Sequence, residues 1–76
     1  MFRRMVNFVI GKEDTIKVVD TLSRYGAIRI VTMEEGKHYQ LVLCCAAEEL
    51  QHCLDNILKL SKSGVSIKRM NIKYIV

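Results

Sequence analysis

The apolar residues of this chain repeat with two different periods, and the order of these periods limits the fold most strongly. Alternate residues are apolar in segments 5–10, 27–33, 38–45 and 65–76, which is the period of a strand. Spacings of three and four residues occur in segments 12–25 and 47–62, which is the period of a helix. The chain therefore predicts the order β-α-β-β-α-β.

That order predicts an α+β fold of the ferredoxin-like kind, a four-stranded antiparallel sheet with both helices on one face. Gly11, Gly26 and Gly64 stand where predicted elements end, and "EEGK" supplies the turn between the second and third strands. We expect residues 1–76 to form one domain, because the chain is short and holds neither proline nor a low-complexity linker.

The predicted helices and the last strand each carry an expectation about which side chains face the core. The apolar residues of segment 65–76 change parity after Ile67, which predicts either a bulge or a change of face near Lys68 and Arg69. The residues expected to face the core are Ile16, Val19, Leu22 and Tyr25 in the first helix, and Leu50, Cys53, Leu54, Ile57 and Ser61 in the second, flanked by Leu58 and Leu60.

All three cysteines and both histidines fall within "HYQLVLCCAAEELQHCL", residues 38–54, a composition that raises the question of a metal or thiol site. Cys44 and Cys45 are neighbours on a predicted strand, so their side chains point to opposite faces. Cys45 and Cys53 occupy predicted core positions, and no spacing typical of a zinc or redox site is present. We predict a non-enzymatic protein without metal or cofactor, in which Cys44 is the thiol on the open face.

The sheet face away from the helices is expected to be more apolar than a solvated face usually is. We interpret it as the interface of a homo-oligomer, formed through the sheet face or a sheet edge. The alternative is that the strands tolerate valines on a solvent-exposed face. The predicted interface residues are Met5, Val9, Val31, Met33, Val42 and Cys44.

The chain has a net charge of +4, from twelve Lys and Arg against eight Asp and Glu. This excess serves solubility in many small proteins, protects sheet edges, or meets an anionic partner. An RNA- or DNA-associated module is therefore the alternative function, although no aromatic residue is firmly placed on the open face for base stacking. The basic cluster that would serve it is Arg3, Arg4, Lys68, Arg69 and Lys73.

The N-terminal "MFRRMVNFVIG" combines basic and apolar residues, but Asn7 interrupts the apolar run and no small-residue cleavage site follows. We interpret it as a strand rather than a signal peptide, and nothing in the chain approaches the length of a membrane span. The odd number of cysteines agrees with a reducing compartment. We therefore expect a cytoplasmic protein without a membrane partner.

The stretch "VNFVIGKEDTIKVVDTLSRYGAIRIVTMEE" resembles the ACT-like small regulatory domains. In that family a strand ends in a loop with glycine, a helix follows, and a glycine after the helix begins the second strand. Gly11, Leu22, Gly26 and Ile30 match this pattern.

The resemblance implies a regulatory or assembly module that pairs with a second copy and binds a small effector, such as an amino acid, at the interface. It further implies a second protein chain on which such a domain acts. The effector site it implies contains Gly11, Lys12 and Glu13, with Arg29 nearby.

Overall fold

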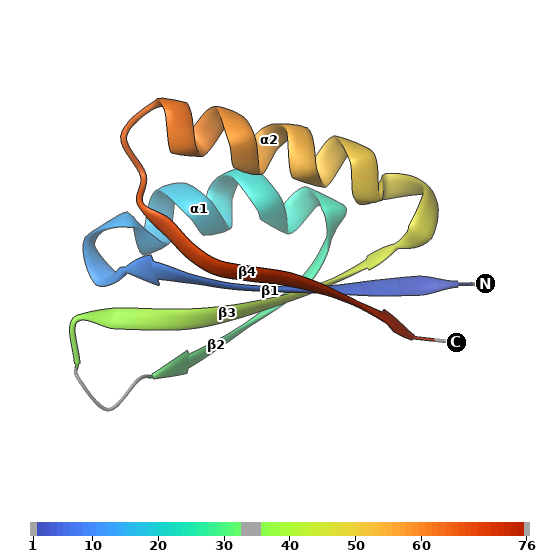
Figure 1. The fold of residues 1–76 in the computed structure, drawn as a ribbon, viewed down its shortest axis with the longest axis horizontal. Helices are drawn as coiled ribbons and strands as arrows, with labels where there is room; N and C mark the ends of the chain where they lie inside the picture. Colours follow the sequence, from blue (N-terminus) through green and yellow to red (C-terminus); the bar gives the residue numbers. More distant parts are fainter. Residues whose placement is uncertain (1, 33–35, 76) are drawn as a thin grey trace.

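The computed structural model describes residues 2–32 and 36–75 as a single twisted sheet with two helices packed on one side (Figure 1). The α+β class and the four-stranded antiparallel sheet with two helices are as predicted. The strands are β1 (Arg3–Gly11), β2 (Gly26–Thr32), β3 (His38–Ala46) and β4 (Ile67–Ile75). The helices are α1 (Thr15–Leu22) and α2 (Leu50–Lys62), with the 3-10 turns η1 (Lys12–Asp14), η2 (Ser23–Tyr25) and η3 (Ala47–Glu49).

The strands lie in the order β2-β3-β1-β4, and every neighbouring pair is antiparallel. β1 is hydrogen-bonded on both sides, to β3 and to β4, so it forms the centre of the sheet together with β3. β2 and β4 are the two outer strands. β1 and β2 run in the same direction with β3 between them, because each is antiparallel to β3.

The core lies between the sheet and the helices and follows from the period of two in β1 and β3. Val6, Phe8 and Ile10 alternate along β1 and are completely buried. Apolar side chains of β3 and of both helices complete the layer, and its burial supplies the main driving force for folding. The other members are Val18, Leu22, Leu41, Leu43, Cys53, Ile57, Leu60 and Val65.

Of the two alternatives predicted near Lys68 and Arg69, the structure shows the bulge. Asn7 pairs with Asn71 and Val9 pairs with Lys68, so Arg69 and Met70 together lie opposite Phe8. Arg69 has a φ of 53°, in the left-handed region that residues other than glycine seldom adopt. The extra residue lets both Ile67 and Ile72 pack against the core, although one number is odd and the other even.

Two glycines fix the ends of the helices. A Cβ on Gly26 would clash with the backbone carbonyl oxygen of Cys44, so the passage from η2 into β2 leaves no room for a side chain. Gly64 has a φ of 107° after α2, where the Val65 N–H donates to the Leu60 carbonyl at 3.1 Å. Both stops fall where the sequence predicts them.

The predicted core face of α1 is wrong in one position. Ile16 is 77% exposed, whereas Val18 and Leu22 are completely buried. The predicted positions are spaced by three residues, whereas a helical turn has about 3.6. Their side chains therefore move around the helix axis by about half a turn between residues 16 and 25. Val18 and Leu22 are four residues apart and stay on one side. In α2, Leu60 takes the core position expected of the exposed Ser61.

The corrected face of α1 can be tested with two substitutions. We expect Val18→Ala to lower the free energy of unfolding by about 2 kcal/mol, because it leaves a cavity in the core. Ile16→Ala removes more atoms from an exposed position and should change it by less than about 0.5 kcal/mol. Urea denaturation measures both. A larger loss for Ile16→Ala would contradict this face.

Candidate functional site

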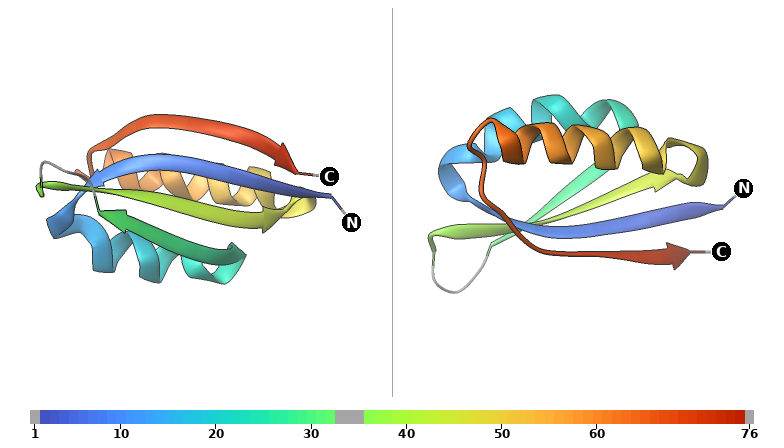
Figure 2. Two further views of the ribbon diagram at one scale, coloured as in Figure 1. Left: turned by 90° about the horizontal axis from the view of Figure 1, so that it is seen from below. Right: turned by 45° about the horizontal axis from the view of Figure 1, so that its top comes forward.

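The face of the sheet away from the helices is not covered by either helix (Figure 2, left). No helix of the described residues crosses it. The pairing of Met5 with Cys44, Asn7 with Val42 and Arg29 with Val42 places these side chains on this face, which we call the open face.

The centre of the open face is hollowed by a shallow depression of about 280 Å³. It contains three of the predicted interface residues, Met5, Val42 and Cys44, all of them half-buried. Val31 lies on β2 and is 41% exposed, whereas Val9 is only 7% exposed within the single chain and Met33 lies outside the described residues. The residues lining this central depression are Met5, Ala27, Ile28, Arg29, Val42 and Cys44.

The three cysteines separate as the sequence predicts. Cys44 lies on the open face, where the Arg3 Nε–H donates to its sulfur at 3.3 Å. Cys45 and Cys53 are buried and free. Burial raises the pKa of Cys45, and it raises the pKa of Cys53 to about 12. Both buried thiols therefore stay protonated at neutral pH and act as small core side chains.

Charge is divided between the two layers of the molecule. The four strands contain no Asp or Glu, and the acidic residues at described positions all belong to helices or 3-10 turns: Glu13, Asp14, Asp20, Glu48, Glu49 and Asp55. The strands contain instead the basic residues Arg3, Arg4, Arg29, Lys68, Arg69 and Lys73. The net positive charge of the chain is thus concentrated in the sheet.

The structure divides the predicted basic cluster between two sides of the sheet. Lys68 pairs with Val9 and Lys73 with Met5, which places both on the open face together with Arg3. Arg4 instead points to the helix side, where its guanidinium lies 4.5 Å from the centre of the Tyr74 ring.

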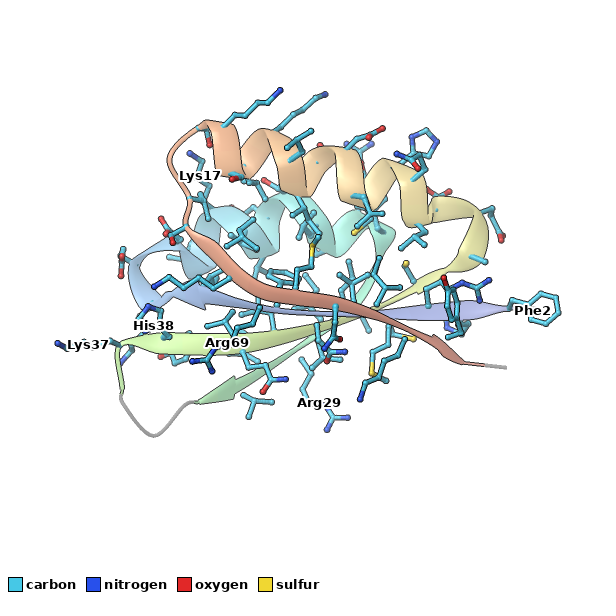
Figure 3. The ribbon with its side chains drawn as sticks, viewed as in Figure 1. Phe2, Lys17, Arg29, Lys37, His38 and Arg69 are labelled. Atoms are coloured by element: carbon cyan, nitrogen blue, oxygen red, sulfur yellow. The ribbon has the colours of Figure 1, made fainter. Side chains whose placement is uncertain are left out.

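Arg69 and Arg29 extend the cluster across the sheet. Figure 3 shows both side chains on the side away from the helices, Arg69 from the bulge of β4 and Arg29 from β2. The sequence alone does not connect Arg29 with the basic cluster, because this connection depends on the strand order. We call Arg3, Arg29, Lys68, Arg69 and Lys73 the basic face.

The predicted effector residues do not gather in one place. Gly11, Lys12 and Glu13 form the junction between β1 and α1, where the Lys12 N–H donates to the Lys37 carbonyl at 3.1 Å and the Lys12 ammonium lies 5.4 Å from the centre of the Tyr39 ring. Gly11 pairs with His38, whereas Arg29 pairs with Val42. Four positions along β3 correspond to about 13 Å, so Arg29 is not part of this junction.

The two outer strands differ in how well their free edges are protected. β4 is bulged and carries Lys68, Arg69 and Lys73, features that discourage pairing with another strand. β2 reads "GAIRIVT" and has neither a bulge in its register with β3 nor any charge besides Arg29. Ile30 and Val31 are 44% and 41% exposed. β2 is therefore the edge open to pairing.

A second depression, of about 300 Å³, lies between α2 and β4. It leaves Leu58 and Met70 about half exposed, because α2 does not fully cover the outer strand. It is lined by Leu54, Ile57, Leu58, Ser61, Ile67, Met70 and Ile72.

The described residues form no group of three His, Cys, Asp or Glu side chains close enough to hold a metal ion. In the same part of the chain, no helix has the length and hydrophobicity needed to cross a bilayer. A scan against protein-family models and a search of curated proteins both find no match for the sequence.

The exposure of the thiols predicts the order in which they react. We expect iodoacetamide to modify Cys44 in the native protein, while Cys45 and Cys53 react only after unfolding, because burial and protonation both suppress attack. Peptide mass spectrometry after a brief treatment identifies the modified residue. Cys44→Ser should then leave the native protein unmodified; labelling of Cys53 in that variant would contradict the described burial.

The raised pKa of Cys53 also predicts loss of stability in alkali. The ordinary value is 9.0 and the folded value about 12, so between these limits the unfolded chain loses a proton that the folded chain retains. The stability from this group is complete below pH 9 and is lost as the pH rises toward 12. Urea titrations at several pH values should show a smaller decline for Cys53→Ala than for the wild type. Equal declines would show that another group is responsible.

Proposed function

We propose that this protein is a non-enzymatic regulatory or assembly module of the ferredoxin-like, ACT-like kind, which joins a second copy of itself in the cytoplasm. The antiparallel order β2-β3-β1-β4 with two helices on one face supports the ferredoxin-like assignment. The single observation that carries the functional proposal is the unprotected edge of β2.

Pairing of two β2 strands would extend the sheet across both copies. In the described part of the chain β2 hydrogen-bonds only to β3, so its other edge has free backbone donors and acceptors. Ile30 and Val31 would bury apolar surface at such a junction. Packing of two open faces against each other is less favourable, because it would oppose two surfaces that carry basic groups only.

A small effector would act by shifting the association of the two copies. The resemblance to ACT-like domains suggests the junction of Gly11, Lys12 and Glu13, which lies at the end of the sheet where β2 also ends. The Lys12 ammonium is suited to the carboxylate of an amino acid. The protein would transmit this change to a second chain.

The alternative is an RNA- or DNA-associated module. It is favoured by one specific observation, the absence of acidic residues from all four strands of a sheet that carries six Lys and Arg residues. Both functions can belong to one molecule, because pairing at β2 would leave the basic face uncovered.

The edge proposal is tested by the mass in solution. Light scattering should give about twice the chain mass of 8.8 kDa for the wild type and the single mass for Val31→Lys, which places a charge at the β2 edge. Met70→Lys is the matched control, because Met70 is 47% exposed on the other outer strand; it should remain dimeric.

Two further results would refute this arrangement. A monomeric wild type at all concentrations removes the assembly function. A dimer that is separated by Val42→Lys, in the central depression, but not by Val31→Lys assigns the interface to the open face instead of the edge.

A further inference from the structure

The basic face combines a concentration of positive charge with a surface of the twisted sheet that no described element covers. Its five members come from three strands, and one of them, Arg29, lines the central depression. Within the described strands no carboxylate is available to neutralise them. A surface of this kind attracts polyanions.

We propose that the basic face binds nucleic acid through the phosphate backbone alone, without base stacking, so that it accepts a duplex as readily as a single strand. This inference rests on the alternative function named above and specifies its surface and mode. The proposed binding surface differs from the predicted basic cluster in one residue, because it contains Arg29 and not Arg4.

The dimensions of the basic face match several phosphates. Lys68 pairs with Val9, which is six positions from Arg3 along β1. Arg3 and Lys68 are therefore separated by about 20 Å along the strands. Arg29 lies three strands away from Lys73, or about 14 Å across the sheet. A duplex carries one phosphate for about every 1.7 Å of its axis, so the five side chains can reach separate phosphates along one bound segment.

The aromatic residues lie away from the open face. Phe8 is buried in the core, Tyr25 and Tyr39 pack against it, and Tyr74 lies beside Arg4 on the helix side. Phe2 is 60% exposed, but it projects beyond the end of β1 and not over the sheet (Figure 3). The described positions of the open face carry no aromatic ring. Proteins that bind single strands tightly stack bases on such rings, so this surface gains nothing from unpaired bases.

The contacts of Arg3 hold one phosphate-binding group in place. Its Nη2–H group donates to the Cys44 carbonyl at 3.5 Å, in addition to the bond from Nε–H to the sulfur. These bonds use only part of the donors of a guanidinium, so others remain for a phosphate oxygen. Arg3 is thereby directed over the open face.

The test compares two variants that lose the same charge from different layers. One carries Arg3→Gln, Arg29→Gln and Lys73→Gln in the sheet, and the other Lys17→Gln, Lys59→Gln and Lys62→Gln in the helices. Fluorescence anisotropy measures their binding to a mixed-sequence duplex of about 20 base pairs and to one of its strands, between about 50 and 200 mM salt. Thermal melting confirms that both variants fold.

We expect wild-type binding that weakens with salt, at similar affinity for duplex and single strand. On a duplex, the slope of log K against log salt should decrease by about 0.9 for each phosphate that the sheet variant no longer neutralises. The helix variant should retain the wild-type slope.

Four results would overturn the inference. Equal losses of affinity in both variants would mean that only net charge matters. Tighter binding of the single strand by tenfold or more would indicate stacking. Displacement of the duplex by polyglutamate at equal charge concentration would identify an acidic protein as the partner. Absence of binding to either nucleic acid would remove the alternative function itself, while a light-scattering mass in the same buffer reports on the assembly function independently.

Discussion

The packing of a single sheet face against two helices is the constraint on which the rest of this structure depends. Val6, Phe8 and Ile10 on the central strand are completely buried because α1 and α2 cover that side. The described residues form no further helix or strand that covers the other side. The open face must therefore meet solvent or a partner, and its side chains determine what the molecule can bind.

The division of charge follows the same two layers. Acidic residues of the described chain lie in the first turns and along the helices, where Glu13, Glu48 and Glu49 also favour the helix dipoles. Basic residues lie on the strands. The helices therefore present a mixed surface to solvent and the sheet a uniformly positive one, so a partner that distinguishes the two sides by charge alone would choose the sheet.

Most of the fold could be predicted from the spacing of the apolar residues. Alternation along a strand shows which side chains share a face of the sheet, even when the order of the strands is unknown. The parity change after Ile67 predicted an irregularity near Lys68 and Arg69, and the strand register shows that it is a bulge. The predicted core face of α1 was partly wrong, because residues spaced by three do not remain on one side of a helix, and Ile16 is exposed.

The site was harder to predict. The separation of Arg4 from Arg3, the approach of Arg29 and the weak edge of β2 all depend on which strands are neighbours. The sequence alone shows that the predicted strands contain no Asp or Glu. This pattern would have predicted that the sheet is the positively charged layer.

The bulge at Arg69 has a consequence for the size of any assembly. A sheet with two open edges can add copies at both ends and grow into a ribbon without limit. Here the kinked, basic outer strand ends the sheet on one side, while β2 leaves it open on the other. If two copies pair through β2, as proposed, each copy uses its unprotected edge, so the assembly would close at two by rotational symmetry and would not polymerise.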